Sequence, residues 1–337
     1  MDTKQILRII YFTKTGELLG KRISTDNSYF FIECKSKDCS VSDFVRESFE
    51  LNIPFVFIGA TGIAVRSIAP FLRDKLTDIP VIVVDELGQN VIPILSGHYG
   101  GGNDIAILLA KHLKANAIIT TASDVNGIFA IDVFARKNGL IINNKDYIKG
   151  VNERLLENKS VTINIDTNVT ESSKINLPNN INLETGSEDY QVTISDNDNS
   201  LLTLIPKRLV LGIGCKKNKS FEELLDFVTR EFSMDYLRKN LFAIASIDVK
   251  ADELGLIKLA SFFSAKFIVY SAGQLSELVG DYSDSDFVMD TVGVSNVCER
   301  AAVLAAGLGK RKLVLEKKAG NGITLAAAKR DTIDLHW

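Results

Sequence analysis

Residues 92–104 read IPILSGHYGGGND. The apolar residues before Ser96 are typical of a strand, and the residues from Ile105 to Leu113 have the apolar pattern of a helix. Between them, four glycines within six positions indicate a backbone that bends sharply or approaches another group closely. We expect Asn103 to cap the helix that follows. The N–H groups of the loop and of the first helical turn then form a candidate anion-binding site.

His98 is the one side chain of this loop that can move a proton near neutral pH, so it is a candidate general base. The alternative is a tight turn in which the histidine only hydrogen-bonds to the backbone. Of the two other histidines, His112 lies near the end of a predicted helix, where the helix dipole favours a cation. His336 lies near the end of the chain, and we expect it to be frayed. Neither indicates a chemical role.

The length and composition favour a multidomain globular protein. A chain of 337 residues is long enough for two or three domains, and 46% of the residues are hydrophobic. The formal net charge of −3 argues against a general binder of nucleic acid. No apolar run reaches the roughly 20 residues of a membrane span, and the first residues do not read as a secretory signal. The four cysteines have no metal-like spacing, so we expect no metal site. We also expect a cytoplasmic protein.

Further strand–loop–helix units surround the glycine-rich loop. The strand 54–58 leads into Gly59 and Gly62 and then into a helix that carries Arg66, which together suit a carboxylate or phosphate. An ordinary strand-to-helix turn with a surface arginine fits the same residues. The strand 81–84 ends at Asp85 and Glu86, which form either a turn or a pair of carboxylates directed at the His98 loop.

A fourth unit follows the glycine-rich loop. The strand 117–121 leads into the polar residues 122–127, which include Asp124. Such repeated units predict an α/β domain with a mostly parallel sheet. Because ligands of these sheets lie at the carboxyl ends of the strands, we expect all of these loops at one edge.

The composition divides the rest of the chain. We predict an N-terminal α/β domain over 1–146, a small middle region with a few strands and a poor core over 147–206, and a C-terminal α/β domain over 207–337. Both α/β domains should have mostly parallel sheets. The middle region is rich in Asn, Asp and Ser, and it offers no evident chemistry.

The C-terminal domain should begin with a buried strand, 209–211, and a loop, 212–219. Lys217 stands where a dinucleotide-binding loop has its third glycine, so nicotinamide binding is not expected. Ser220 and Glu223 form a capping box for the next helix. The loop lysines suit carboxylates, and they would lower the pKa of Cys215 if its thiol were exposed. A small buried thiol is the alternative.

Near the end of the chain, an alanine-rich helix should be capped by Ser295. Cys298 and Glu299 lie in its first turn and are its reactive-looking side chains. Asn321 and Gly322 predict a hairpin between two strands, 312–317 and 323–328.

Taken together, these loops resemble the cobalt-precorrin-5A hydrolase family (CbiG) of anaerobic cobalamin biosynthesis. The resemblance rests on seven segments in the N-terminal and C-terminal thirds: FIGATGIAVR at 57–66, VDELG at 84–88, LSGHYGGGN at 95–103, TTASD at 120–124, LGIGCK at 211–216, VSNVCE at 294–299 and GITLA at 322–326. Gly102 stands where an alanine is usual in the family.

The resemblance implies a carbon–carbon bond hydrolase whose substrate is a cobalt-containing, ring-contracted tetrapyrrole with a δ-lactone. Water opens the lactone, and the extruded meso carbon leaves with its methyl group as acetaldehyde, which gives cobalt-precorrin-5B. The cobalt belongs to the substrate, and no cofactor is expected. We expect the macrocycle in a cleft between the two α/β domains. A homodimer and other enzymes of the pathway are further partners to consider.

Within this reading, His98 is the first choice for the base, and the N–H groups of Gly100 to Asn103 are the first choice for the oxyanion site. Four carboxylates are unranked candidates for a second base: Asp85, Glu86, Asp124 and Glu299. The residues expected to bind the substrate come from the same loops: Gly59, Thr61, Gly62, Arg66, Ser96, Gly97, Gly100, Gly101, Asn103, Thr121, Gly214, Cys215, Lys216 and Ser295.

Two other functional classes fit parts of the sequence. One is a carrier that binds a corrinoid intermediate without catalysis. The other is a hydrolase in which Cys215 or Cys298 forms an acyl-enzyme.

Overall fold

The computed structural model describes residues 5–25, 29–35, 38–75, 77–169, 175–197, 201–278, 296–307 and 313–337. Ser295, predicted to bind substrate and to cap a helix, lies outside the described residues. The chain forms two compact units. The N-terminal unit comprises Asp2–Gly127 and Ile257–Ser264, and the C-terminal unit comprises Ile128–Leu256 and Ala265–Trp337. Each unit is described by itself.

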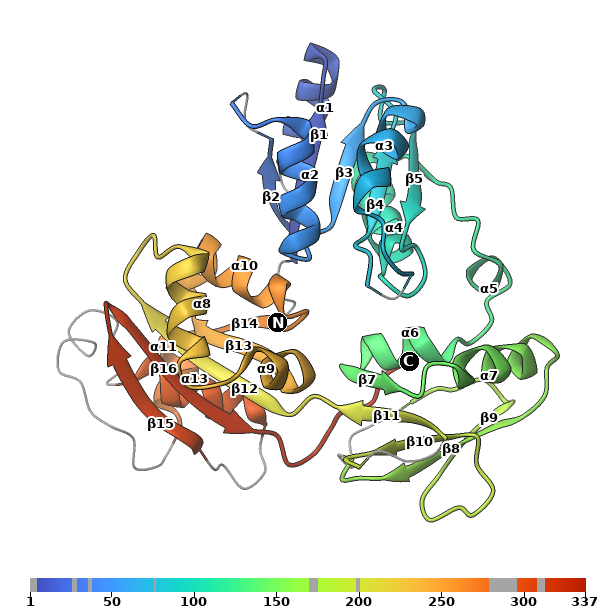
Figure 1. Cartoon of the computed structure of the whole chain (residues 1–337), viewed down its shortest axis with the longest axis vertical. Helices are drawn as coiled ribbons and strands as arrows, with labels where there is room; N and C mark the ends of the chain where they lie inside the picture. The colour runs from blue at the N-terminus through green and yellow to red at the C-terminus, as the bar shows by residue number, and fades with distance from the viewer. Residues whose placement is uncertain are drawn as a thin grey trace. The chain divides into compact units, whose positions relative to one another are not determined.

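The N-terminal unit alternates strands and helices (Figure 1). Its elements are β1 (Gln5–Tyr11), α1 (Lys14–Ser24), β2 (Phe30–Cys34), α2 (Val41–Glu50), β3 (Phe55–Ile58), α3 (Thr61–Ile68), the 3₁₀ helix η1 (Ala69–Phe71), β4 (Val81–Val84), β5 (Asn90–Leu95), α4 (Gly102–Leu113), β6 (Asn116–Ala117) and α5 (Ala122–Val125).

One strand reversal divides the loops of this unit between two edges. The sheet has the order β2-β1-β3-β4-β5-β6, and β1 to β4 run parallel. β5 is antiparallel to β4, with Val81 opposite Leu95 and Val84 opposite Val91, and β6 is parallel to β5. The carboxyl ends of β1, β3 and β4 therefore form one edge, the β3 edge. Those of β5 and β6 form the opposite one, the β5 edge.

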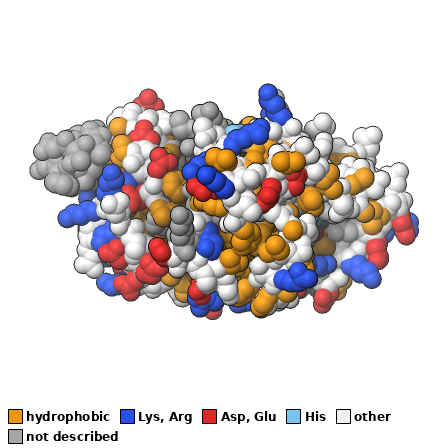
Figure 2. Space-filling model, turned by 90° about the horizontal axis from the view of Figure 1, so that it is seen from above, with side chains coloured by type: hydrophobic (Ala, Val, Ile, Leu, Met, Phe, Trp, Pro, Cys, Tyr) orange, Lys and Arg blue, Asp and Glu red, His pale blue; other side chains and the backbone are white. Residues whose placement is uncertain are grey.

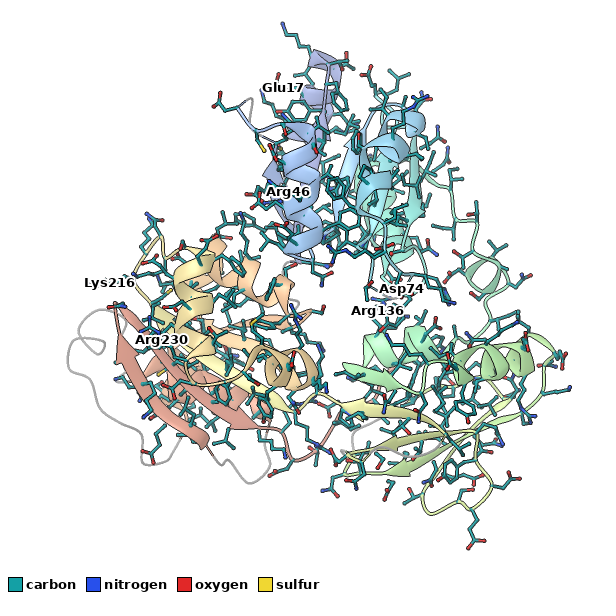
Figure 3. All side chains as sticks on the ribbon, in the orientation of Figure 1. Glu17, Arg46, Asp74, Arg136, Lys216 and Arg230 are labelled. Atoms are coloured by element: carbon teal, nitrogen blue, oxygen red, sulfur yellow. The ribbon has the colours of Figure 1, made fainter. Side chains whose placement is uncertain are left out.

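The expectation that all the loops share one edge is therefore wrong. Figure 3 shows the two ends of the unit through two labelled residues. Glu17, in the first turn of α1 after β1, lies at one end, and Asp74, before β4, lies at the other.

The core of this unit lies on both faces of the sheet. On one face, side chains of β1, β3 and β4 pack with α1 and α4, and on the other face they pack with α2 and α3 (Figure 1). Burial on both sides explains why β3 and β4 are continuously apolar.

α1 is a regular helix although it contains two glycines, Gly16 and Gly20. Thr13 caps the helix by accepting a hydrogen bond from the Gly16 N–H at 3.0 Å. A Cβ atom at Gly20 would lie 3.2 Å from the Tyr11 ring, so this glycine lets the helix approach β1 closely. These glycines thus allow close packing of the helix against β1.

The C-terminal unit contains two sheets. Its elements are α6 (Ile131–Lys137), β7 (Leu140–Asn143), α7 (Tyr147–Leu156), β8 (Val161–Asp166), β9 (Ile181–Glu184), β10 (Val192–Ser195), β11 (Leu202–Pro206), β12 (Leu209–Cys215), α8 (Phe221–Thr229), α9 (Met234–Asn240), β13 (Leu241–Ile247), η2 (Asp248–Lys250), α10 (Leu254–Phe262, which belongs to the N-terminal unit from Ile257 on), β14 (Lys266–Tyr270), α11 (Ala272–Ser276), α13 (Val297–Ala306), β15 (Leu313–Gly320) and β16 (Ile323–Lys329).

The middle region is better ordered than its composition suggests. Together with β7, which precedes it in the chain, it forms a sheet in the order β7-β11-β10-β8-β9, and Ile163, Ile194 and Leu204 are fully buried in this sheet. The expected poor core is wrong because short apolar strands alternate with Asn-rich and Asp-rich loops, and the average composition hides them.

The second sheet has the order β14-β13-β12-β16-β15. The hairpin prediction is confirmed, since β15 and β16 are joined by Asn321 (φ 51°) and Gly322 (φ 73°). β12 continues to Cys215, although residues 212–215 were expected in a loop. α13 packs against β12 over Gly212, where a Cβ atom would lie 1.8 Å from the Cys298 carbonyl oxygen.

The last residues of the chain are held in place, which corrects the expectation for His336. The His336 N–H donates to Asn138 Oδ1 at 2.6 Å, and Asn138 Nδ2 donates to the His336 carbonyl at 2.9 Å. The Trp337 ring lies 4.4 Å from that of Phe129. In addition, Arg208 pairs with Asp196 at 2.5 Å and donates to the Asp331 carbonyl at 3.1 Å.

We predict that Gly212→Ala destabilises the protein, because its methyl group would collide with the backbone of α13. The free energy of unfolding should fall by roughly 1–3 kcal/mol or more in urea titrations. The matched control is Gly150→Ala in α7, where nothing lies within 4 Å. This change should stabilise the helix by about 0.5–1 kcal/mol. Equal stability of the two variants would contradict the prediction.

Candidate functional site

The glycine-rich loop at the β5 edge is closed by its own backbone. The Gly102 N–H donates to the Ser96 carbonyl at 3.0 Å, and the Asn103 N–H donates to the Gly97 carbonyl at 2.8 Å. The Gly101 N–H donates to the His98 carbonyl at 3.3 Å. Three of the four N–H groups predicted to stabilise an oxyanion therefore already donate to backbone carbonyls. The expectation is wrong for these three, which belong to Gly101, Gly102 and Asn103.

Two glycines of this loop are required by close contacts. A Cβ atom at Gly97 would lie 2.5 Å from Asn103 Oδ1, and one at Gly100 would lie 2.6 Å from Ser96 Cβ. Ser96 has φ 49° and donates from Oγ to the Asp78 carbonyl at 2.5 Å. Ser96, Gly97 and Gly100 thus shape the loop.

Asn103 does not cap α4, contrary to expectation. The cap residue is Gly101, whose φ of 87° suits a glycine. Asn103 lies inside the first turn and is 5% exposed. Its Nδ2 donates to Thr121 Oγ1 at 3.1 Å and to Asp124 Oδ2 at 2.8 Å. Asn103 therefore connects α4 to the segment after β6, and it positions a carboxylate.

His98 and Asp124 form the chemically notable pair of this edge. His98 Nδ1 lies 2.7 Å from Asp124 Oδ2, and the side chains are 21% and 33% exposed. Because a carboxylate only accepts hydrogen bonds, Nδ1 carries the proton and Nε2 is the acceptor nitrogen. The pair is an imidazole held in orientation by a carboxylate, and both side chains are partly exposed to solvent.

Ser123 is the functional candidate that the sequence analysis missed. Its Oγ lies 3.3 Å from His98 Nε2 and 3.4 Å from Nδ1. The signal available in the sequence was its position directly before Asp124 in the TTASD segment.

The carboxylates of the β3 edge serve local structure. Asp85 accepts hydrogen bonds from the N–H groups of Leu87, Gln89 and Asn90 at 3.0, 3.3 and 2.6 Å. Burial would raise the pKa of Asp85, but these hydrogen bonds outweigh it and lower the pKa. Glu86 accepts from the Thr13 hydroxyl at 2.7 Å. The structure does not bring either carboxylate to His98.

The other predicted binding residues of this unit also lie at the β3 edge. Gly59 (φ 146°) ends β3, Thr61 and Gly62 begin α3, and Arg66 is exposed on that helix. Exposed apolar side chains lie at the same edge, among them Phe12, which is 49% exposed. Figure 2 shows such hydrophobic side chains at the surface with charged groups among them. These residues stay candidates for binding, at an edge separate from His98.

Glu299 of the C-terminal unit is 3% exposed. It accepts from Asn296 Nδ2 at 2.7 Å and from the Lys317 N–H at 2.8 Å, which joins α13 to β15. α13 is capped by the Asn296 side chain, whereas Ser295 was predicted to cap it. These hydrogen bonds give Glu299 a structural role and explain why its carboxylate is buried.

Gly214 and Cys215 belong to strand β12, and Lys216 follows it, exposed at the surface (Figure 3). Burial raises the pKa of Cys215 to about 11 and that of Cys298 to about 11. The structure has the alternative of a buried thiol: β12 extends further than expected and half-buries Cys215, so burial outweighs the lowering of its pKa by the nearby lysines. Neither cysteine suits nucleophilic attack near neutral pH.

The described ranges contain neither a cluster of metal-binding side chains nor a membrane-spanning helix. No group of three or more His, Cys, Asp or Glu side chains there could hold a metal ion. In the same residues, no helix has the length and apolar character needed to cross a membrane.

Three family models match this chain. They are described as "Cobalamin synthesis G N-terminal" over residues 43–124, "Cobalamin biosynthesis central region" over 129–206 and "Cobalamin synthesis G C-terminus" over 209–328. They follow one another with short gaps.

Curated relatives are similar over most of their length. A cobalt-precorrin-5A hydrolase of Salmonella typhimurium is 35% identical over 301 residues, which cover 86% of this chain and 85% of the relative. One of the same name from Priestia megaterium is 29% identical over 309 residues, which cover 86% and 82%. A crystal structure of a cobalamin biosynthesis protein G homolog from Sulfolobus solfataricus is 24% identical, with a TM-score of 0.43 and coverage of 97% of both chains.

We predict that iodoacetamide modifies Cys215 and Cys298 very slowly at pH 7.5. With a pKa of about 11, roughly one thiol in three thousand is ionised there. The rate measured by peptide mass spectrometry should rise about tenfold per pH unit towards pH 11. The half-buried Cys39 is the internal comparison, and the chain in denaturant should react at all four cysteines. Rapid modification of native Cys298 at pH 7.5 would refute the prediction.

Proposed function

The chain belongs to the cobalt-precorrin-5A hydrolase family of cobalamin biosynthesis, and from this membership we propose that it opens the δ-lactone of cobalt-precorrin-5A and releases acetaldehyde. The product would be cobalt-precorrin-5B. The observation that carries the proposal is the His98–Asp124 pair at 2.7 Å, which supplies an oriented base beside a half-open surface. Family membership supports the substrate, and the pair supports the chemistry.

The first step needs a base for the oxygen that attacks the lactone carbonyl. His98 Nε2 accepts this proton, and Asp124 stabilises the imidazolium that forms. The lactone C–O bond then breaks, and the departing oxygen takes the proton back from Nε2. The net result is addition of one water, with a carboxylate on one side and a hydroxyl on the other.

The second step uses the oxygen that has just departed. It is bound to the carbon that carries the methyl group, so the new hydroxyl lies next to Nε2. Removal of its proton gives an alkoxide that collapses to acetaldehyde, and the bond to the ring breaks with its electrons left on the macrocycle. One base therefore serves both steps. Asp85, Glu86 and Glu299 are not needed for them, in line with their structural hydrogen bonds.

We propose that the cobalt enters with the substrate and that the chain contributes no cofactor of its own. The acetate and propionate groups of a tetrapyrrole need cations and N–H donors. Lys216 of the C-terminal unit stays a proposed ligand for them, whereas Arg66 lies at the β3 edge, opposite to His98, and is not assigned to the reacting site. A cytoplasmic location and a homodimer complete the proposal, and fractionation and size-exclusion chromatography would test them. A non-catalytic carrier would bind the substrate but release no aldehyde.

We predict that His98→Ala lowers the rate of acetaldehyde release by roughly 10²–10⁴-fold, because the base for both steps is lost. The assay follows aldehyde and the mass of the tetrapyrrole after addition of cobalt-precorrin-5A. The matched control is His112→Ala in the same unit, whose ring only contacts the Arg22 carbonyl at 3.2 Å. Turnover of folded His98→Ala near that of the control would exclude the site.

We predict that Asn103→Ala lowers kcat by roughly 10–100-fold with a much smaller change in KM, because Asp124 loses the donor that orients it. Asn103→Ser, which keeps a donor, should recover part of the rate. An effect on KM alone would show that Asn103 contacts the substrate and does not position the pair.

A further inference from the structure

We infer that the C-terminal unit contains a further ligand site, in which the guanidinium of Arg330 binds a small oxyanion of the carboxylate or phosphate type. Arg330 directly follows β16, whose last residue, Lys329, lies opposite the first residue of β12. The site is therefore at the amino end of β12, whereas Gly214 and Cys215 lie at its carboxyl end. The inference goes beyond the proposed function and does not depend on it, since no residue of lactone opening takes part.

The guanidinium of Arg330 is buried without a hydrogen-bonding partner. Arg330 is 6% exposed, and its backbone N–H and carbonyl are both bonded to Arg208. Its side chain makes no hydrogen bond to any residue that the structure describes. The ion pair of Nη2 with Asp334 Oδ2 is 3.7 Å long, which is too far for a hydrogen bond, and the Asp334 side chain is 48% exposed.

Arg208 shows what a structural arginine of the same burial looks like in this unit. It is 7% exposed, and its Nε and Nη2 donate to Asp196 at 2.5 and 2.8 Å. Its Nη1 donates to the carbonyls of Arg330 and Asp331 at 3.1 Å each. A buried cation without such acceptors is costly, because the chain does not replace the water that it loses. The burial of Arg330 is therefore explained best by an acceptor that comes from outside the chain.

The ring of Phe242 holds the guanidinium in place and leaves its donors free. Arg330 Cζ lies 3.7 Å from the ring centroid, and stacking of this kind covers the flat face of the guanidinium but not the N–H groups at its rim. Lys266 Nζ lies 4.9 Å from the same centroid and has no ion pair among the described side chains. Two cations thus share one ring, and an anion would relieve their mutual repulsion.

The free donors are accessible and suit an oxyanion. No nitrogen of Arg330 is among the fully enclosed, unpartnered side-chain atoms of the described residues, so solvent reaches its N–H groups. Burial lowers the pKa of Arg330, but a guanidinium stays charged near neutral pH. Its fork of N–H groups matches two oxygens of a carboxylate or a phosphate.

The first test is calorimetric titration of the full chain with inorganic phosphate and, separately, with succinate, both at constant ionic strength. We expect at least one of them to bind, and the tighter one identifies the class of anion. Its affinity should fall by roughly 10–100-fold in Arg330→Met, because charge-assisted hydrogen bonds are lost. The matched control is Arg230→Met, which removes an exposed charge of the same unit and should leave the affinity unchanged. Absence of binding by both anions, or equal affinity in Arg330→Met, would overturn the inference.

The second test is the thermal midpoint, which separates a ligand-binding arginine from a structural one. In Arg330→Met without anion, the midpoint should stay the same or rise, because an apolar side chain replaces an uncompensated buried charge. The anion should raise the midpoint of the wild-type chain but not that of the variant. A lower midpoint of the variant, with no anion effect in the wild-type chain, would show that Arg330 is structural.

Lys266→Gln keeps the inference testable even where Arg330→Met does not fold, since Lys266 is exposed. This change removes the second positive charge at the Phe242 ring, so the affinity for the anion should fall a few-fold. Unchanged affinity in Lys266→Gln, together with an Arg330→Met chain that does not fold, would count against the site.

Discussion

The antiparallel pairing of β5 with β4 decides which residues can share a site in the N-terminal unit. Since β5 returns along β4, Leu95 lies opposite Val81 and the glycine-rich loop begins where β4 starts. The loops after β3 and β4 end at the other edge of the sheet. The loops of the family-like segments were expected at one edge of the sheet. They are instead separated by the length of the strands. The carboxylates and the arginine of the β3 edge therefore lie at the edge opposite to the His98–Asp124 pair.

At the β5 edge, one carboxylate oxygen organises the site. Asp124 Oδ2 accepts hydrogen bonds from both His98 Nδ1 and Asn103 Nδ2. This arrangement needs Gly97, because a side chain there would displace Asn103 Oδ1. The glycines therefore act through the shape of the loop and the position of Asn103, whereas an anion-binding loop would offer its N–H groups to a ligand. Most of those N–H groups bind backbone carbonyls instead.

Features that depend on neighbouring residues were predictable from the sequence. The strand 81–84, the capping box of Ser220 and Glu223 and the hairpin at Asn321–Gly322 all occur as predicted, because their determinants lie within a few residues. The α/β class with its parallel-rich sheets also follows from the repeated units. The direction of β5 was missed in the sequence analysis, although the five residues between Val84 and Asn90 are too few for the crossover that a parallel neighbour needs. Neighbouring residues alone do not determine the burial of the Cys215 thiol, because it depends on how far β12 pairs with β16.

The C-terminal unit shows why residue type alone overstates the reactivity of a side chain. Glu299 looked like an acid or base, yet its burial is compensated by Asn296 and the Lys317 N–H, and removing it would leave these donors unsatisfied. Cys298 belongs to the face of α13 that packs over Gly212, so its thiol is enclosed by packing. By contrast, Lys216 is exposed and has no ion pair among the described side chains. Exposed cations attract carboxylates but transfer no proton at neutral pH, so this unit is better suited to holding an acidic substrate than to reacting with it.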